Sequence, residues 1–407
     1  MIKRVLYLDL WKEVSSGKQM IFLSGPRQVG KTTLTVEIAK GFKNNVYFNW
    51  DIIENKKKLL KNPVFFETIN RIDESDPLII LDEIHKYKQW KNYLKGIYDQ
   101  FSADYKFLIS GSGRLDLFQK GGDSLAGRYF QLHLLPLTIA ELSKKRRSIE
   151  NFLKNPINEF DINEVNISQD EWDLLSSFGG FPEPFIKNSK TFLNRWSRTY
   201  LAQLLREDIR SLTEVKKVDD IEILFSLLPS KIGSPLSINN LVGDSQVSYV
   251  SIKEWLNLFE TFYLTFRISP WTKKISRAIL KEKKLYLYNY TEIEAEGYRF
   301  ENMVALELLR CMYSWNEHGY GKFNLHYIRN KDKEEVDFLI TESNNPLLLV
   351  ETKFAEETVS KNLIKFQNEL NVPAVQLVNT KNVFKYFKNN NNKILVVTAP
   401  RWLASLP

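Results

Sequence analysis

The sequence is poor in cysteine and histidine. Its 407 residues include one cysteine, Cys311, and four histidines. A single cysteine excludes an internal disulfide framework and any cysteine-rich zinc site, and it fits a reducing cytoplasm. Long hydrophobic runs are also missing: no stretch reaches the ~18 apolar residues of a membrane-spanning helix, and the apolar run after Lys3 and Arg4 is broken by Asp9. We therefore expect a cytoplasmic protein with no secretion signal and no membrane partner.

The overall composition is that of a folded globular chain. Hydrophobic residues make up 43% and charged residues 26% of the sequence, which are ordinary values for globular proteins. A chain of this length holds about two to four domains, because single hydrophobic cores stop growing well below this size. The net charge of +8 favours anionic partners such as nucleic acid only slightly, since a lysine-rich surface also serves solubility.

A glycine-containing segment is the most informative part of the sequence. Gly25-Pro-Arg-Gln-Val-Gly-Lys-Thr-Thr33 fits the phosphate-loop pattern Gly-x-x-x-x-Gly-Lys-[Ser/Thr], and it closely follows an apolar run at residues 20–23. The pattern predicts a buried strand, a loop whose backbone N–H groups face phosphate, and a helix over residues 31–42 that presents its positive end to the ligand.

We expect ATP to be bound by the whole loop, which consists of Gly25, Pro26, Arg27, Gln28, Val29, Gly30, Lys31, Thr32 and Thr33. Within the loop, Lys31 is predicted to reach the β- and γ-phosphates. Thr32 is predicted to hold Mg²⁺ through its hydroxyl, because Mg²⁺ prefers oxygen ligands shared between protein, phosphate and water. Thr33 is the weaker candidate for that role.

Two adjacent acids mark the end of another predicted strand. Residues 78–81 are apolar and lead into Asp82 and Glu83, which is how a buried parallel strand presents acids at its carboxyl edge. Ligands of open α/β sheets bind at this edge. We expect Asp82 to bind Mg²⁺, directly or through water, and Glu83 to position and deprotonate the attacking water.

Two further polar residues lie at the ends of predicted strands. Ser110 ends the strand predicted at residues 105–110, and Arg128 precedes the strand predicted at residues 129–134. Ser110 is a candidate sensor of the γ-phosphate or of its water, and a structural turn serine is the alternative. Arg128 is a candidate finger that stabilises transition-state charge on the nucleotide of a neighbouring subunit, which implies a homo-oligomer. A salt-bridged surface arginine is the alternative for Arg128.

Together these motifs resemble a known family. Residues 25–33, Leu81-Asp-Glu-Ile-His85, Ser110-Gly-Ser112 and Ser124-Leu-Ala-Gly-Arg128 are similar to motifs of a large prokaryotic family of AAA-like P-loop ATPases with a characteristic C-terminal domain of unknown function. The same family is matched by Phe178-Gly-Gly-Phe-Pro-Glu183, Leu205-Arg-Glu-Asp-Ile209, Glu335-Val-Asp337 and Glu351-Thr-Lys353. The resemblance covers nearly the whole chain and implies an ATPase that uses ATP and Mg²⁺, while it leaves the substrate undefined.

The segment after the ATPase motifs is predicted to be helical. Residues 171–208 surround a Gly-Gly-Phe-Pro turn and favour a lid over the nucleotide. Arg206 lies on an amphipathic helix of this lid. It either touches phosphate or pairs with a local acid such as Glu207 or Asp208.

Residues 219–270 predict three helices and a strand with the spacing of a winged helix. The helix that would enter a groove carries one cation, Lys253, so packing or protein contact is favoured over base recognition. The basic stretches at residues 271–277 and 281–284 are stronger candidates for phosphate contact, with a solvated basic turn as the alternative.

A second constellation of acids lies in the C-terminal part. Glu301 falls on a predicted helix, Asp337 opens a predicted strand, and Glu351 and Lys353 share one face of the next strand because side chains alternate along it. The pattern resembles the Asp…Glu-x-Lys signature of restriction-endonuclease-type metal nucleases. The resemblance implies that Glu301, Asp337 and Glu351 hold Mg²⁺ or Mn²⁺ and that Lys353 supports the attacking water. A scaffold that keeps the fold without cleavage is the alternative.

The sequence as a whole predicts an α/β protein with five segments. We expect an AAA-like P-loop ATPase core at residues 1–142, a linker or variable insertion at 143–165, a helical lid at 166–218, a winged-helix-like domain at 219–280 and a restriction-endonuclease-like α/β domain at 281–407. The leading hypothesis is an ATPase that couples nucleotide state to sequence-nonspecific DNA binding or remodelling, with nuclease activity open. The alternative is a regulatory switch in which ATP gates a protein–protein interface and the C-terminal domain is only a binding platform.

Overall fold

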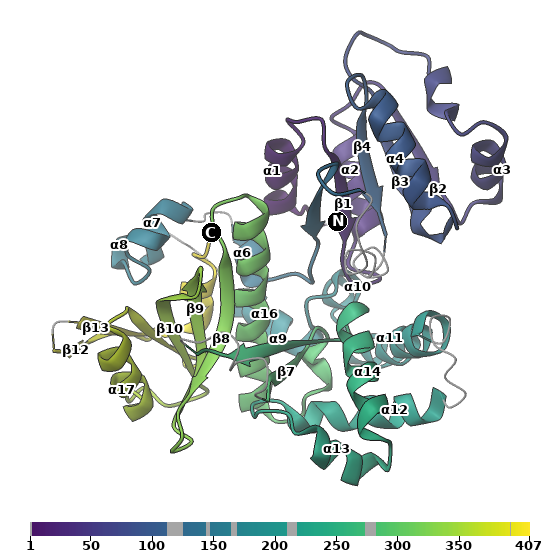
Figure 1. Ribbon diagram of the computed structural model, residues 1–407. Helices are drawn as coiled ribbons and strands as arrows, with labels where there is room; N and C mark the ends of the chain where they lie inside the picture. Colours follow the sequence, from purple (N-terminus) through teal and green to yellow (C-terminus); the bar gives the residue numbers. More distant parts are fainter. Residues whose placement is uncertain are drawn as a thin grey trace. The chain divides into compact units, whose positions relative to one another are not determined.

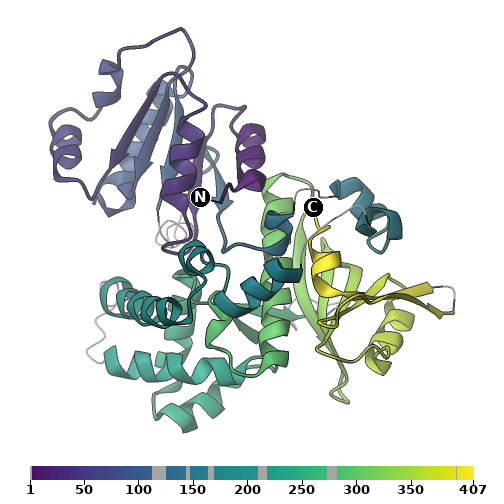
Figure 2. The same ribbon diagram turned by 180° about the vertical axis from the view of Figure 1, so that it is seen from behind.

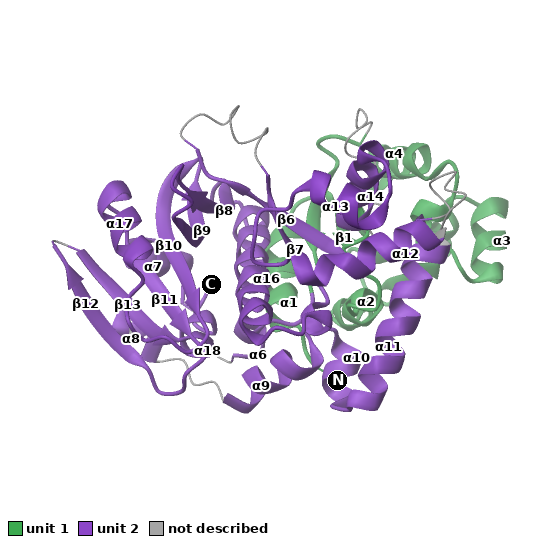
Figure 3. Ribbon diagram, turned by 90° about the horizontal axis from the view of Figure 1, so that it is seen from below, with its two compact units in different colours: residues 1–135, 261–263 green, residues 136–260, 264–407 purple. Residues whose placement is uncertain are grey.

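The chain folds into two compact units. The computed structural model describes residues 2–111, 125–143, 147–163, 169–209, 218–272, 282–390 and 392–407. One unit holds residues 1–135 together with 261–263, and the other holds residues 136–260 and 264–407 (Figure 3). Ser124, Lys281 and residues 273–277 of the predicted basic wing lie outside the described residues.

The first unit is built on a parallel sheet of five strands in the order β2-β3-β4-β1-β5. The strands are β1 Met20–Ser24, β2 Asn45–Asn49, β3 Leu78–Asp82, β4 Lys106–Ser110 and β5 Tyr129–His133. β1 and β3 are buried along their whole length, as expected for parallel strands covered on both faces. The predicted α/β core is confirmed.

Helices cover both faces of this sheet. They are α1 Val5–Val14, α2 Lys31–Ala39, α3 Ile53–Lys61 and α4 Trp90–Phe101, with 3₁₀ turns at Phe65–Thr68 and Ile84–Lys86. The helix after the phosphate loop therefore ends at Ala39 rather than at the predicted Phe42. Figure 1 shows the sheet from the side of α4, and Figure 2 shows it from the side of α2.

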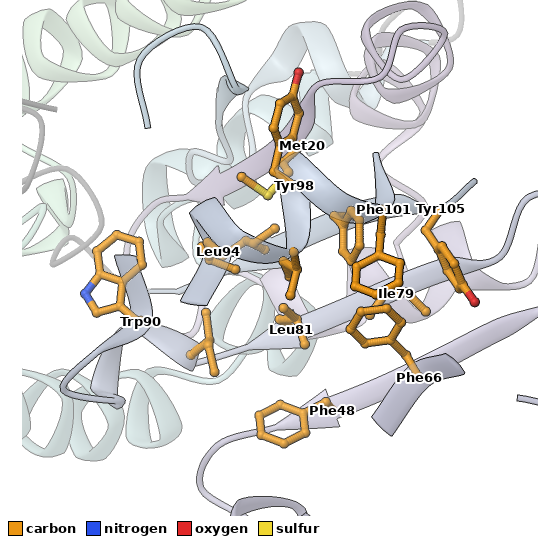
Figure 4. Packing of buried hydrophobic residues seen from close by; sticks show 14 of the residues in the cluster. Met20, Phe48, Phe66, Ile79, Leu81, Trp90, Leu94, Tyr98, Phe101 and Tyr105 are labelled. Atoms are coloured by element: carbon orange, nitrogen blue, oxygen red, sulfur yellow. The ribbon is translucent and has the colours of Figure 1, made fainter. Parts of the chain in front are cut away.

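Side chains alternate along β1, so they pack into two separate hydrophobic layers, one on each face of the sheet. Ile21 and Leu23 pack with residues of α1 and α2, whereas Met20 and Phe22 pack with residues of α3 and α4. The second layer is rich in aromatic rings (Figure 4). The ring of Phe66 lies 5.2 Å from that of Phe101 and 5.3 Å from that of Tyr105, measured between centroids. These two layers hold the sheet rigid beneath its strand ends.

The register of the sheet collects polar residues at its carboxyl edge. Asn49 lies opposite Asp82, and Asp82 lies opposite Ser110, in neighbouring parallel strands. β1 pairs with β4 and ends in Ser24, after which the phosphate loop begins. The phosphate loop and the acid of β3 therefore lie at the same edge, where open α/β sheets bind their ligands.

Gly25 has a backbone conformation and a close backbone neighbour that a residue with a Cβ would not tolerate. Its φ is +141°, and a Cβ added there would lie 2.1 Å from the carbonyl oxygen of Leu134. Gly30 also has a positive φ, 99°, at the start of α2. Glycine adopts such conformations without steric cost.

We expect Gly25→Ala to destabilise the first unit by about 1–3 kcal/mol or more, because a positive φ and a backbone clash add together. Gly96→Ala is the matched control: Gly96 lies within α4, and a Cβ there would meet no atom within 4 Å. This change should stabilise the protein by about 0.5–1 kcal/mol. Thermal unfolding of both variants is the measurement, and equal melting temperatures would contradict the assignment of Gly25.

The second unit begins with helices. They are α6 Ile139–Leu142, α7 Ile149–Lys154, α8 Glu159–Asn163, α9 Gln169–Phe178, α10 Pro182–Lys187, α11 Lys190–Gln203, α12 Val218–Leu227, α13 Ile238–Ser245 and α14 Tyr249–Thr261, with a π-helical turn at Leu204–Ile209 and a 3₁₀ turn at Leu228–Lys231. The predicted helical character of the lid segment is confirmed. Among the described helices, none combines the length and the apolar content needed to cross a bilayer.

An eight-stranded sheet forms the rest of this unit, in the order β12-β13-β11-β10-β9-β8-β6-β7. Its strands are β6 Thr265–Pro270, β7 Lys284–Leu287, β8 Phe323–Arg329, β9 Glu335–Glu342, β10 Asn345–Lys353, β11 Ala374–Val378, β12 Phe384–Asn389 and β13 Asn392–Thr398. A 3₁₀ turn at Tyr290–Glu292 and the helices α16 Glu296–Glu317, α17 Lys361–Leu370 and α18 Ala399–Leu403 accompany it.

The sheet crosses the domain boundary that the sequence suggested at residue 280. β6 pairs with β7 on one side and with β8 on the other, so the last strand of the expected winged helix belongs to the same sheet as the C-terminal strands. Four residues of α14, Ile252, Trp255, Leu256 and Phe259, are buried, which agrees with packing rather than groove entry. The winged-helix and restriction-endonuclease assignments themselves stay predictions.

The segment expected to be a linker or variable insertion is folded over residues 147–163. Phe152 of α7 is fully buried, with its ring centroid 5.0 Å from that of Trp315. Arg147 is buried and donates to the carbonyl oxygen of Ser405 at 3.2 Å. A linker interpretation is therefore wrong for these residues. The helices are too short for hydrophobic periodicity to reveal them, because the signal needs a window of about 11 residues or more.

Candidate nucleotide-binding site and C-terminal charged cluster

Lys31 lies inside the phosphate loop that precedes it. Its side-chain Nζ donates to the carbonyl oxygens of Gly25 at 2.9 Å and Pro26 at 2.6 Å, and the residue is buried. Lysine carries three donors and no acceptor, so its ammonium is held here by loop carbonyls. The structure thus places Lys31 with the backbone of the loop, as the motif predicts.

Arg4 supports the loop from outside the motif. It is buried, and its guanidinium donates to the carbonyl oxygen of Val29 at 3.1 Å and to that of Leu135. In the sequence, Arg4 is recognisable only as a basic residue near the N-terminus. No local pattern identifies this role, because its partners lie far along the chain.

Asp82 is the centre of a hydrogen-bond cluster at the carboxyl edge. Its carboxylate is buried, with 2% of the residue exposed. One oxygen, Oδ2, accepts from Thr32 Oγ1 at 3.0 Å and from the Tyr47 hydroxyl at 2.7 Å. The other, Oδ1, accepts from Ser110 Oγ. The structure therefore brings together the predicted residues Thr32, Asp82 and Ser110, while Thr33 is exposed on α2.

Tyr47 and Asn49 of β2 were not predicted for this cluster. Asn49 Nδ2 lies 3.5 Å from Asp82 Oδ2 and 3.4 Å from the Tyr47 hydroxyl. Burial, followed by the hydrogen bond to Asp82, raises the pKa of Tyr47 to about 12. The hydroxyl therefore stays protonated and donates to the carboxylate at neutral pH. The sequence shows an aromatic strand at this place, and only the strand order puts it beside β3.

Glu83 turns away from the strand direction of β3. It adopts a positive φ of 57°, and its backbone N–H donates to the Ser110 carbonyl oxygen at 2.9 Å. Its carboxylate Oε2 lies 3.0 Å from Lys86 Nζ, and Lys86 also pairs with Asp51 at 2.6 Å. Half-burial alone would lower the pKa of Lys86, but these two acids raise it. Glu83 therefore stands at the site edge as a carboxylate held by a lysine, apart from the donors around Asp82.

Arg128 lies at the opposite edge of the sheet from the phosphate loop. Its carbonyl oxygen accepts from the N–H of Met20, the first residue of β1, whereas the loop follows the last residue. Five residues of strand span about 16 Å. The guanidinium forms a two-pronged ion pair with Asp99, at 2.8 and 3.3 Å. Within one chain it is thus a surface ion pair, and a role on a neighbouring subunit's nucleotide stays a prediction.

Arg206 pairs with a local acid. Its guanidinium contacts both carboxylate oxygens of Glu222 in α12, at 2.6 and 3.1 Å. The side chain is 59% exposed. The side chains of Glu207 and Asp208 are not among the described ones. Local pairing, one of the two alternatives for Arg206, is the one that the structure shows.

A buried lysine organises the C-terminal acids. Lys284 Nζ lies 2.6 Å from Glu335 Oε1, 3.1 Å from Glu301 Oε1 and 3.3 Å from Asp337 Oδ1. Its side chain is 0% exposed. The prediction that residues 281–284 contact phosphate is therefore wrong for Lys284. Adjacency to a basic run suggested a surface position, but Lys284 is the first residue of β7 and points inward.

The remaining predicted residues of this cluster lie on β9 and β10. Asp337 Oδ2 accepts from the N–H of Thr352 at 3.0 Å and from its hydroxyl at 2.6 Å. Glu351 Oε1 pairs with Lys353 Nζ at 3.0 Å, and its Oε2 accepts from the N–H of Asp337 at 3.3 Å. Glu351 and Lys353 share one face, as alternation predicted.

Burial raises the pKa of two of these acids. Burial and, after it, the charge of Asp337 raise the pKa of Glu301 to about 7 and that of Glu351 to about 8. Burial alone would lower the pKa of Lys284, but Tyr286 and the surrounding acids raise it well above its ordinary value. Lys284 therefore remains charged at neutral pH.

The predicted second metal site does not have the expected form. Among the described residues, no three histidine, cysteine, aspartate or glutamate side chains are arranged to hold a metal ion. Glu301 and Asp337 turn to Lys284, and Glu351 turns to Lys353. These acids and Lys353 were predicted from the sequence, but Lys284 was missed because it lies 17 and 53 positions from Glu301 and Asp337.

Proteins of two other organisms are similar in sequence to this chain. A protein of Methanocaldococcus jannaschii described as uncharacterised is 23% identical over 414 residues, covering 94% of this chain and 87% of its own length. An uncharacterised protein of Mycobacterium tuberculosis is 21% identical over 268 residues, covering 66% of this chain and 54% of its own.

Solved structures that this chain matches include the Aeropyrum pernix ORC1 protein in complex with DNA, at TM-score 0.30 and 12% identity, covering 73% of this chain and 92% of that one. AMPPCP-bound DnaA from Aquifex aeolicus reaches TM-score 0.30 at 13% identity, covering 63% of this chain and 86% of that one. Similarity at this level supports no argument about activity.

We expect Tyr47→Phe to lower the free energy of unfolding by about 1.5–3 kcal/mol, because it removes a hydrogen bond to a buried charged group. Tyr93→Phe is the matched control, since the Tyr93 hydroxyl donates to the neutral carbonyl of Pro63 at 2.9 Å and its loss should cost about 0.5–1.5 kcal/mol. Urea unfolding of both variants, of Asp82→Ala, and of Tyr47→Phe combined with Asp82→Ala measures the coupling. If the two substitutions change the free energy of unfolding additively, the hydrogen bond between Tyr47 and Asp82 does not contribute to stability.

Family models divide the chain into three matched regions. Residues 17–143 match the AAA domain, and this region contains the phosphate loop, Asp82, Glu83 and Ser110. Residues 169–290 and 296–401 match two domains of unknown function, DUF8612 and DUF4143. The chain therefore combines an AAA domain of the P-loop type with two C-terminal domains of unknown function, as the resemblance of its motifs implied.

Proposed function

We propose that this chain is an Mg²⁺-dependent ATPase whose nucleotide state controls its C-terminal domains. One observation carries the proposal: Thr32 of the phosphate loop and the buried Asp82 of β3 are directly hydrogen-bonded at the carboxyl edge of a parallel sheet. These are the two oxygen donors that Mg²⁺ would share with the phosphates of a bound nucleotide.

The residues present fit ATP and its metal. Gly25 and Gly30 both have positive φ, which lets the loop backbone take the path that the phosphate-loop motif requires. Lys31 supplies the positive charge, and the N-terminus of α2 supplies backbone donors. Thr32 and Asp82 would hold the ion, which neutralises phosphate charge when it is bound.

Glu83 is the residue that we assign as general base. It is the first residue after β3, beside the cluster that would hold the metal, and its carboxylate Oε2 is shared with Lys86 at 3.0 Å. A carboxylate can accept from a lysine and from a water at the same time, because it offers about four acceptor positions. Lys86 then holds the Glu83 carboxylate at the site edge, where a water can still reach it. Ser110 would orient that water or the γ-phosphate from the neighbouring strand end.

We expect Glu83→Gln to slow ATP hydrolysis by about 10²–10⁴-fold while nucleotide affinity is nearly retained, because only the base is lost. Lys31→Ala should weaken ATP binding by about 10- to 100-fold, since it removes charged hydrogen bonds to phosphate. Steady-state hydrolysis and equilibrium binding of a fluorescent ATP analogue separate the two effects. Unchanged turnover in Glu83→Gln would remove Glu83 from the mechanism.

Charge and composition support a proposal for the partner of the C-terminal domains. The net charge of +8 favours an anionic partner, and we propose sequence-nonspecific DNA in a cytoplasmic setting that suits the single, buried Cys311. The neutralisation of the C-terminal acids by Lys284 and Lys353 favours binding without cleavage. The second candidate is a switch that gates a protein partner through the same domains.

ATP turnover should rise when single-stranded, duplex or branched DNA is added, and plasmid DNA should remain intact in Mn²⁺. Because nonspecific binding depends on released counterions, affinity should fall with salt, with a slope of about −0.9 per phosphate contact on duplex DNA in a log–log plot. Anisotropy of labelled DNA over a salt series measures it. If DNA neither binds nor changes ATP turnover, the switch that gates a protein partner is the function. If the protein cuts plasmid DNA and Asp337→Ala abolishes the cutting, the C-terminal domain is a nuclease.

A further inference from the structure

Three acidic oxygens converge on one point in the second unit. Glu335 Oε1, Glu301 Oε1 and Asp337 Oδ1 lie 2.6, 3.1 and 3.3 Å from Lys284 Nζ. Glu301 belongs to α16, Glu335 and Asp337 belong to β9, and Lys284 begins β7. The ammonium therefore ties a helix and two strands together at a single position.

This arrangement needs a cation at its centre. Buried carboxylates that face one another repel, and removing them from water is costly unless they are paired. The Tyr286 hydroxyl donates to Glu301 Oε1 at 2.8 Å, which satisfies one acceptor but adds no charge. Lys284 is thus the central positive group, and the raised pKa of Lys284 shows that its surroundings favour the charged form.

The other acids of the cluster have their own cations. Arg329 lies 3.2 Å from Glu335 Oε2, and Lys353 lies 3.0 Å from Glu351 Oε1. Three basic groups, Lys284, Arg329 and Lys353, thus face four acids, Glu301, Glu335, Asp337 and Glu351. Each of the four acids therefore has a cation of its own chain within 3.3 Å, without any bound metal.

We propose that Lys284 is an internal counter-ion that takes the place of a divalent cation, so that the protein neither binds nor requires a metal among Glu301, Glu335 and Asp337. The site that resembles a metal nuclease is then closed by a residue of its own chain. This inference does not depend on ATP hydrolysis, since none of these residues belongs to the first unit.

The proposal predicts that removing the ammonium opens a cation site. Shortening Lys284 to alanine leaves three carboxylates around a space formerly filled by a charged group. Ca²⁺ binds oxygen at about 2.3–2.6 Å in flexible geometry, whereas Mg²⁺ demands about 2.0–2.1 Å in a near-ideal octahedron. The oxygens would have to move less for Ca²⁺, so Lys284→Ala should gain Ca²⁺ in preference to Mg²⁺.

The experiment uses the full chain without nucleotide. Thermal unfolding and calorimetric titration with Ca²⁺ are compared for the wild type, Lys284→Ala and Lys353→Ala. In EDTA, Lys284→Ala should melt below the wild type. Ca²⁺ should then raise its melting temperature and occupy one site more per chain. The wild type and Lys353→Ala, which retain Lys284, should show neither the rise nor the additional site.

A second comparison keeps the proposal testable if Lys284→Ala does not fold. Ca²⁺ and Mg²⁺ uptake is measured for the wild type and for Asp337→Asn, in which any ion at Thr32 and Asp82 is unaffected. Equal uptake is expected. A cation that the wild type binds and Asp337→Asn loses would overturn the proposal, as would a folded Lys284→Ala that binds no more Ca²⁺ than the wild type. Combining Lys284→Ala with Asp337→Asn should abolish the gained site.

Discussion

The strand ends of the parallel sheet are the constraint on which the nucleotide site depends. Helices cover both faces, so the interior of β1 and β3 accepts only apolar side chains. Polar chemistry is left to the carboxyl edge, where β3 ends in Asp82 and β4 ends in Ser110. The parallel register of β2, β3 and β4 places Asn49, Asp82 and Ser110 next to one another. No local sequence signal links these three residues.

Much of this site can be predicted because its signals are local. A strand, a glycine loop and a helix in succession define where Lys31 and Thr32 lie, and four apolar residues followed by an acid define Asp82. Tyr47 and Arg4 could not be predicted in the same way. Tyr47 reaches Asp82 only because β2 is the neighbour of β3, and Arg4 reaches the loop across a distance of 25 residues in sequence.

In the C-terminal cluster, the central residue could not be predicted from local sequence signals. Side-chain alternation predicted that Glu351 and Lys353 share a face, and they do. Lys284 was assigned to a basic surface because Lys281 and Lys283 stand beside it in the sequence. All four residues of β7 are buried, and the acids of α16 and β9 make the burial of Lys284 tolerable. Net charge per segment carries no information about which member of a basic run is buried.

The two acidic centres differ in the kind of donor that surrounds them, and this difference bears on which of them can take a metal. In the described structure, the donors that contact Asp82 are hydroxyls and an amide, which are neutral. A hydroxyl can rotate and offer a lone pair instead, so Thr32 can change from a donor to Asp82 into a ligand beside it. The acids around Lys284 face an ammonium, which has no lone pair when charged and cannot coordinate a cation. A metal at Asp82 therefore needs only a reorientation of neutral groups, whereas a metal at Asp337 would have to displace a buried positive charge.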